Sequence, residues 1–219
     1  MLLNGLWIHP GRSAMLIQST NIPAQATDWS EVLNFDLLDP TTGMLNSITF
    51  TIEAALSGQV NLENMDPANN TVMYTYQASF EALRPGTNTV FLSVLPSLSG
   101  NEMLDPFDGA LDFSGPSGAM IPLSVSLTNS LTTTNALDLA LFQGVGTVGF
   151  DMNAIGLHAV VGEVGKLDPQ MLIVSDGQAV VTLTYDFTPI PEPSTLAFVG
   201  LAVGVMALRR RFSARAAAD

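Results

Sequence analysis

The 219-residue sequence contains no cysteine and only two histidines, His9 and His158. Without cysteine the protein can form no disulfide, no thiolate metal site and no thiol nucleophile. Two histidines without cysteines cannot supply the usual zinc ligand sets. No Gly-rich phosphate-binding loop followed by lysine is present either. These absences exclude most metal, thiol and nucleotide chemistry, and we expect no resident cofactor.

Charge is scarce and strongly one-sided. Charged residues make up 12% of the chain, about half the fraction usual in globular proteins. Before Pro191 the only basic residues are Arg12, Arg84 and Lys166, against 18 acidic residues, which gives a formal net charge of −15. Such a surface repels phosphates, so we exclude nucleic acid as a partner.

Apolar and polar residues alternate with a period of two along much of the chain, which predicts strands with one buried and one exposed face. The dipeptides Ser57-Gly58, Asp66-Pro67, Pro85-Gly86 and Asp176-Gly177 are typical turn signals. Pro122 places its strand at a sheet edge or on that strand's first rung. The predicted strands cover residues 48–56, 60–62, 72–82, 90–94, 121–127 and 181–187.

These strands predict an all-β fold, in which two antiparallel sheets pack as a β-sandwich of the jelly-roll or immunoglobulin-like type. One stretch differs. Asn135 resembles an N-cap, Asp138 follows in the first turn and Gly144 can close the far end, so residues 136–142 are predicted to form a two-turn helix crossing between the sheets. Leucines also alternate there, so a strand stays open as an alternative. We divide the chain into an extension (1–13), a sandwich domain (14–188) and a C-terminal segment (189–219).

The C-terminal segment has three distinct parts. Pro191-Glu192-Pro193 comes first, an uncharged run of 15 residues (194–208) follows, and a basic cluster ends it. As a helix the run spans roughly 22 Å, short of the roughly 30 Å hydrocarbon core of a bilayer. Snorkelling arginines or local thinning of the bilayer can make up part of the difference. We therefore predict a single transmembrane helix with a cytoplasmic C-terminus; a buried core helix is the alternative, but it leaves three consecutive arginines with no core to cap. The membrane residues are Leu196, Phe198, Gly200, Gly204 and Leu208, and the cytoplasmic basic residues are Arg209, Arg210, Arg211 and Arg215.

This tripartite pattern resembles the PEP-CTERM sorting signal of exopolysaccharide-producing Gram-negative bacteria. The resemblance implies that exosortase, a membrane-embedded protease or transpeptidase, is a transient partner and cleaves near Pro191, Glu192, Pro193 and Ser194. It also implies transit through the inner membrane, then the cell surface or the extracellular matrix. Gly200 and Gly204 form a Gly-x-x-x-Gly step, for which two interpretations stay open. Either it allows another helix to approach closely, exosortase or a second copy, or small residues are simply common in membrane helices.

The N-terminus does not match this export. Residues 1–13 have no basic n-region and no long apolar run. We expect that Met1 is a misassigned start and that the true signal peptide lies upstream or was lost. The alternative is a protein that is never exported.

Several pieces of the sandwich domain resemble the choice-of-anchor E domain of exported bacterial proteins, a family with no assigned active site. The name reflects its varied surface anchors, and the resemblance implies no biochemical activity. The matching pieces are Ile22-Pro23 with Thr27-Asp28-Trp29, Phe35 with Asp39-Pro40 and Gly43-Met44-Leu45, Leu62 through Asp66, Phe107-Asp108-Gly109 with Phe113 through Gly118, and Asp138 through Phe142.

The strongest candidate for chemistry is a loop with three acids, Asp105, Asp108 and Asp112, whose oxygens can gather about Ca²⁺. The competing and favoured interpretation is that these aspartates are turn residues. A catalytic carboxylate pair is a third, less favoured interpretation. His158 lies in a strand-like segment, where a lone histidine is usually structural.

We predict a non-enzymatic, exported sandwich protein of the cell surface or matrix. The alternatives are a carbohydrate-binding module, with extracellular polysaccharide as partner, or a calcium-stabilised adhesin-like domain; an acid-pair hydrolase has no motif behind it. Sugar binding usually needs exposed rings, yet the candidates beyond Trp7 are few. They are Trp29, Tyr74, Tyr76 and Tyr185, and the three tyrosines fall on predicted buried faces.

Overall fold

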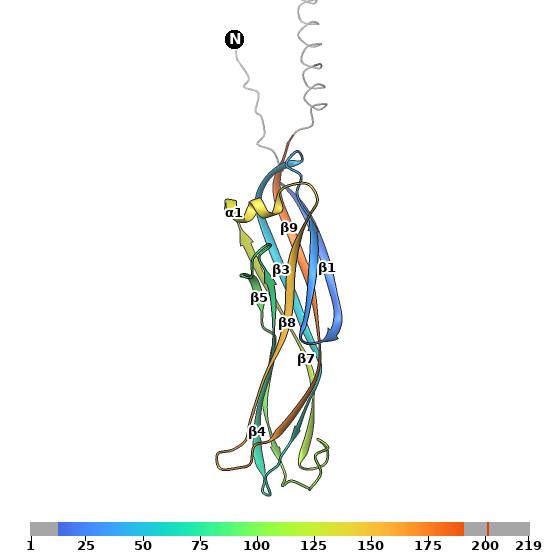
Figure 1. Ribbon diagram of the computed structural model, residues 1–219, viewed down its shortest axis with the longest axis vertical. Helices are drawn as coiled ribbons and strands as arrows, with labels where there is room; N and C mark the ends of the chain where they lie inside the picture. The colour runs from blue at the N-terminus through green and yellow to red at the C-terminus, as the bar shows by residue number, and fades with distance from the viewer. Residues whose placement is uncertain (1–12, 191–200, 202–219) are drawn as a thin grey trace, which may run out of the picture.

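The structure is a computed structural model that describes residues 13–190 and Leu201. Its strands run along the long axis of an elongated body and form two antiparallel sheets, as the sequence predicted (Figure 1). The first sheet has the order β1 (Ala14–Ala26), β9 (Gln170–Pro189), β3 (Gly43–Glu63) and β7 (Gly118–Thr133). The second has the order β2 (Trp29–Asp36), β8 (Thr147–Val161), β4 (Asn70–Leu83) and β5 (Val90–Val94), and β6 (Ser97–Leu104) also pairs with β4. Pro122 lies on the edge strand β7, where its missing N–H costs no ladder hydrogen bond.

Strands β3 and β9 are the two central strands of the first sheet. They pair along their whole lengths, from Gly43 opposite Pro189 to Glu63 opposite Gln170. The turns predicted at Ser57-Gly58 and at Asp176-Gly177 are therefore wrong, and Ser57 lies directly opposite Asp176 inside the paired strands. Gly58 has φ +137°, and a Cβ there would lie 2.1 Å from the carbonyl oxygen of Val174. Glycine is needed here because two strands approach closely, rather than because the chain reverses.

The core between the sheets is rich in aromatic rings. Phe50 from β3 packs against Phe150 from β8 with ring centroids 4.8 Å apart. Phe142 stacks on Phe150 at 5.7 Å and meets the ring of Tyr185 edge-on at 6.2 Å. All four side chains are fully buried. Each buried phenylalanine contributes about 1.5–3 kcal/mol from transfer out of water.

A short helix connects the sheets, as predicted. It consists of α1 (Ala136–Leu139) and a 3-10 turn, η1 (Ala140–Phe142), and it leads from β7 to β8. The Asn135 side chain caps it by accepting a hydrogen bond from Leu137 N at 2.9 Å. Asp138 forms an ion pair with Arg84 and accepts a hydrogen bond from the Thr133 hydroxyl. This capping and pairing, together with buried Phe142, favour the helix over the alternating strand.

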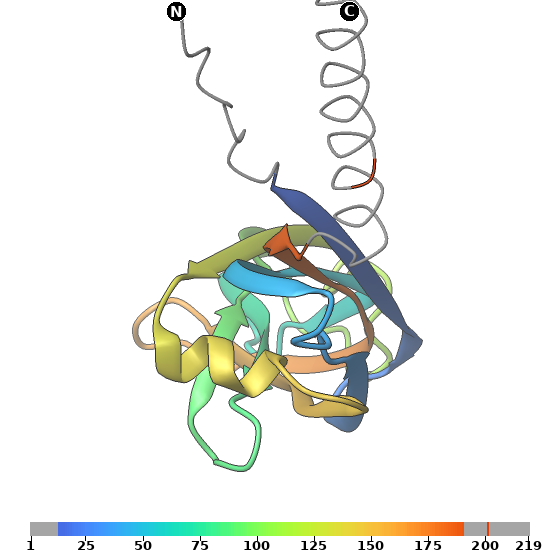
Figure 2. The same cartoon turned by 90° about the horizontal axis from the view of Figure 1, so that it is seen from above.

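The two ends of the elongated body are formed by different strand ends and connections. β1 begins beside the end of β9, with Ala14 opposite Phe187, so the described sandwich begins and ends at this proximal end (Figures 1 and 2). The connections β3–β4, β6–β7 and β8–β9 lie at the opposite, distal end (Figure 1). The distal loops are therefore the part of the sandwich farthest from the C-terminal segment.

Candidate functional site

The C-terminal segment leaves from a firmly held strand end. The last residues of β9 pair with Met44 and Gly43, and Ile190 N donates to Thr42 O at 3.1 Å. No helix in the described part of the chain is long and apolar enough to cross a membrane. The predicted sorting and membrane residues lie outside the described residues: Pro191, Glu192, Pro193, Ser194, Leu196, Phe198, Gly200, Gly204, Leu208, Arg209, Arg210, Arg211 and Arg215.

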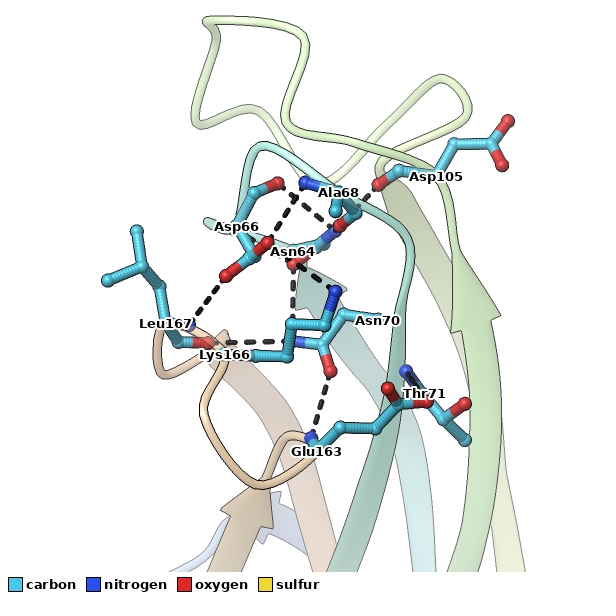
Figure 3. Close-up of polar contacts among 9 residues, drawn as sticks. All are labelled: Asn64, Asp66, Ala68, Asn70, Thr71, Asp105, Glu163, Lys166 and Leu167. Atoms are coloured by element: carbon cyan, nitrogen blue, oxygen red, sulfur yellow. Dashed lines mark hydrogen bonds and ion pairs between the residues drawn. The ribbon is translucent and has the colours of Figure 1, made fainter.

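At the distal end a cluster of polar side chains ties three connections together (Figure 3). We call it the distal polar cluster. Its centre is Asn64, which is fully buried between the ends of the sheets. The Asn64 amide nitrogen donates to Asp105 O at 2.7 Å and to Ala68 O at 2.9 Å. Its carbonyl oxygen accepts hydrogen bonds from Asp66 N and from the Asn70 amide, so both ends of the side chain are engaged.

The β8–β9 connection joins the same cluster. Asn70 accepts a hydrogen bond from Glu163 N at 2.9 Å. Asp66 accepts one from Leu167 N at 2.9 Å, and Lys166 lies 3.8 Å from the same carboxylate. The pKa of Asp66 is lowered chiefly by the hydrogen bonds from the backbone N–H groups of Leu167 and Ala68, with a smaller effect of the Lys166 charge. The ionised form of Asp66 therefore helps to fix the distal loops.

Two of the three aspartates of the β6–β7 loop, Asp108 and Asp112, act as turn residues in this structure. Asp108 accepts a hydrogen bond from Ala110 N at 2.9 Å, and Asp112 accepts one from Ser114 N at 2.9 Å. Asp105 accepts one from the Asn69 side chain at 3.1 Å. Among residues 13–190 no group of three or more His, Cys, Asp or Glu is arranged to hold a metal ion. The first two contacts are the local aspartate turns that the competing interpretation predicted, and calcium binding by this trio stays a prediction.

A second polar feature lies midway along the body, where β1 crosses into β2. The hydroxyls of Thr27, Tyr76 and Ser175 form a triangle, with Thr27 and Tyr76 3.0 Å apart. They line an open groove of about 580 Å³ between β8 and β9. Asp28 also lines the groove. Its backbone is in the left-handed region at φ 76°, and its side chain accepts a hydrogen bond from Gly156 N at 2.8 Å.

His158, Trp29 and the three tyrosines considered as binding candidates all lie in strands. His158 is exposed in β8 and also lines this groove, opposite Tyr76 in the strand pairing. The rings of Tyr74, Tyr76 and Tyr185 are buried, as predicted. Trp29 is half-buried and donates its indole N–H to Gly177 O at 3.2 Å. The described residues therefore present no exposed row of Trp or Tyr rings on which a sugar could stack.

Neither the distal polar cluster nor the hydroxyl triangle of Thr27, Tyr76 and Ser175 was predicted from the sequence. Asn64 and Asn70 flank a turn and carry no motif, and their partners in the other connections, such as Asp105 and Glu163, are 41 or more residues away in the chain. The available signal was the gathering of Asn and Asp at the ends of predicted strands. That signal is shared with ordinary turns, so it could not single these residues out.

Comparison with known families concerns the C-terminal segment. Residues 189–211 match the PEP-CTERM protein-sorting motif. The chain carries a PEP-CTERM sorting signal. A PEP-CTERM signal implies an exported protein that exosortase sorts and processes at the membrane. Proteins with this signal are typically non-enzymatic cell-surface proteins. The match confirms the resemblance seen at Pro191 to Arg211.

Other comparisons are uninformative about the sandwich. No curated protein matches the chain. Two structures of infectious bursal disease virus are among the similar solved structures. The VP2 subviral particle is 10% identical over 83% of this chain and 38% of its own, with a TM-score of 0.23. The T13 viral particle is 10% identical over 89% of this chain and 47% of its own, with a TM-score of 0.19. The chain spans less than half of these proteins' length, and similarity at these scores bears on neither fold nor function.

Proposed function

We propose that this chain is a non-enzymatic β-sandwich protein of the cell surface or extracellular matrix, released or attached there after exosortase processes its C-terminal segment. The observation that carries the proposal is the position of the PEP-CTERM motif. It begins at residue 189, where β9 ends, so the whole sandwich lies on the N-terminal side of the processed segment. Cleavage after β9 leaves every strand pairing intact.

The geometry of the body supports this arrangement. The processed segment follows the proximal end, and the distal loops lie at the other end of the long axis. A protein attached by its proximal end presents the distal loops to its surroundings. The acidic, sparsely charged body is consistent with a hydrated matrix component. The resemblance to the choice-of-anchor E domain belongs to this proposal, because that domain also accompanies surface anchors.

Processing is tested with the full chain behind an intact secretory signal in an exosortase-positive host. We expect the mature wild-type protein to have lost the mass of the residues that include Arg209 to Arg211. A variant with Pro191, Glu192 and Pro193 all replaced by Ala should keep that mass. Pro67→Ala, at an exposed distal position, is the matched control and should be processed normally. If wild type keeps its arginines in this host, exosortase processing is wrong.

Carbohydrate binding is the second candidate, and the groove beside Thr27 and Ser175 offers hydrogen-bonding hydroxyls for it. The buried tyrosine rings argue against it, because sugar sites commonly rely on stacked aromatic rings. Retardation of the full chain in gels containing the host's exopolysaccharide tests it. Retardation that Ser175→Ala abolishes, with Ser57→Ala as the exposed control, favours this candidate over a purely structural role.

A further inference from the structure

The side chain of Glu63 is fully buried, yet neither carboxylate oxygen has a hydrogen-bond partner. It is the last residue of β3, opposite Gly118 of β7 and Gln170 of β9. Val60 and Leu62 belong to the core between the sheets, so alternation places Glu63 on the outer face of the first sheet. An outer-face glutamate is normally solvated, and the burial of this one needs an explanation.

The β6–β7 loop covers this outer face. A Cβ added at Gly118 would lie 2.3 Å from Ser114 N and 2.6 Å from Ser114 O, so the loop backbone rests directly on the residue paired with Glu63. Phe113 and Gly115 hold it there in left-handed conformations, with φ 56° and 69°. The Ser117 hydroxyl is also fully buried and also lacks a partner, but Ser117 lies opposite Asn64, whose N–H donates to Ser117 O at 2.9 Å. Alternation therefore places it on the other side of the strand from Glu63. The loop thus encloses one carboxylate whose two oxygens are unpaired.

No positive side chain in the described part of the chain is free to neutralise Glu63. Residues 13–190 contain two basic side chains other than histidine, Arg84 and Lys166. Arg84 pairs with Asp138, and Lys166 lies beside Asp66. Burying an unpaired carboxylate is unfavourable, so a partner from outside residues 13–190 is expected.

We propose that Glu63 is the anchoring ligand of a Ca²⁺ ion held beneath the β6–β7 loop, with loop backbone carbonyls as further oxygen donors. All of these donors are oxygen atoms, which suit a hard cation rather than zinc or copper. Ca²⁺ fits better than Mg²⁺ because a bidentate carboxylate and carbonyl donors match its flexible coordination. The site is separate from the aspartate trio, whose oxygens already cap turns of the same loop.

A single carboxylate among neutral donors predicts weak binding. Sites in extracellular modules have dissociation constants on the order of 10⁻⁴–10⁻³ M, and we expect this one to fall in that range. The bound ion stabilises the folded state by mass action and fixes the loop on the end of the first sheet. Calcium binding at Glu63 does not depend on processing by exosortase.

The test is calcium-dependent unfolding and equilibrium Ca²⁺ binding of the full chain, purified in mild detergent. We expect about one Ca²⁺ per chain, and a melting temperature on the order of 5 °C higher in about 5 mM Ca²⁺ than in chelator. The same concentration of Mg²⁺ should give a much smaller shift. Glu63→Gln should lose the calcium response, whereas Glu53→Gln, which removes an exposed glutamate from the same face of β3, should keep it.

The wild-type response decides the proposal even if Glu63→Gln does not fold. Glu63→Asp, which keeps the charge on a shorter side chain, is then the second variant, and it should weaken Ca²⁺ binding at least several-fold. Identical melting in chelator and in Ca²⁺, without Ca²⁺ binding, overturns the proposal. A calcium response that Glu63→Gln retains places the ion elsewhere and overturns it as well.

Discussion

The hydroxyl of Tyr185 donates a hydrogen bond to the backbone oxygen of Asp36 at 2.7 Å. Tyr185 lies in β9 of the first sheet and Asp36 ends β2 of the second, so this contact bridges the sandwich. Burial raises the pKa of the Tyr185 phenol, with the nearby Asp36 charge as a smaller cause. The hydroxyl is therefore held in its neutral, donating form at every ordinary pH.

Replacing Tyr185 by Phe should remove this bridge and keep the packing of the ring. We expect a loss of about 1 kcal/mol in the free energy of unfolding, the usual net value of such a hydrogen bond. Urea unfolding followed by circular dichroism measures it. Tyr74→Phe is the control, because its hydroxyl has no hydrogen-bond partner in the described structure, and it should change stability little. Equal losses in both variants would mean that the bridge contributes nothing of its own.

Asn64→Ala should be among the most destabilising substitutions at the distal end. It leaves Asp105 O and Ala68 O without their donor and Asp66 N without its acceptor, in a site closed to solvent. Since each buried unpaired group costs about 1–3 kcal/mol, we expect a loss of about 3 kcal/mol. Chemical unfolding provides the measurement. Asn69→Ala, exposed five residues along, should lose less than about 1 kcal/mol, and similar losses at both positions would contradict the role given to Asn64.

The ion pair between Asp138 and Arg84 should make stability depend on acid pH. The hydrogen bond from Arg84 lowers the pKa of Asp138 below its usual 3.8, with Thr133 and the Arg84 charge as smaller causes. A carboxyl whose folded-state pKa is lowered stabilises the protein above the unfolded pKa and loses this effect as pH falls through the folded value. The unfolding free energy of Asp138→Asn should therefore fall less than that of wild type between about pH 5 and pH 2. Parallel pH profiles of the two proteins would show that the pair adds no stability.

Gly58→Ala should strain the pairing of β3 and β9. The backbone at Gly58 has φ +137°, and the new methyl group would lie 2.1 Å from Val174 O. A conformational penalty and a collision with backbone together should cost about 3 kcal/mol or more. Thermal unfolding tests this. Gly149→Ala is the matched control within β8, where the nearest atoms lie 3.5 Å away and φ is ordinary, and it should melt close to wild type.

Local patterns predicted β3, β4, β5, β7 and β9, but no strand was delimited in advance at β1, β2, β6 or β8. The alternation from Val72 to Ala82 predicted β4, and Asn135 with Asp138 predicted the connecting helix. The same local logic failed at Ser57-Gly58 and Asp176-Gly177, because a glycine that reverses the chain and a glycine that admits a neighbouring backbone give the same sequence signal. Only the register, which sets Ser57 opposite Asp176, separates the two cases.

The amino-acid sequence by itself determined the sorting signal, since Pro191 to Arg211 is a contiguous pattern read by its order of polar, apolar and basic residues. It also determined the two-faced strands, because a period of two needs no knowledge of partners. Only the tertiary structure decided that the distal polar cluster around Asn64 joins three connections and that Glu63 is enclosed with no partner among the described residues. Those environments arise from loops distant in the chain, and burial of a polar group depends on what folds over it rather than on its neighbours in sequence.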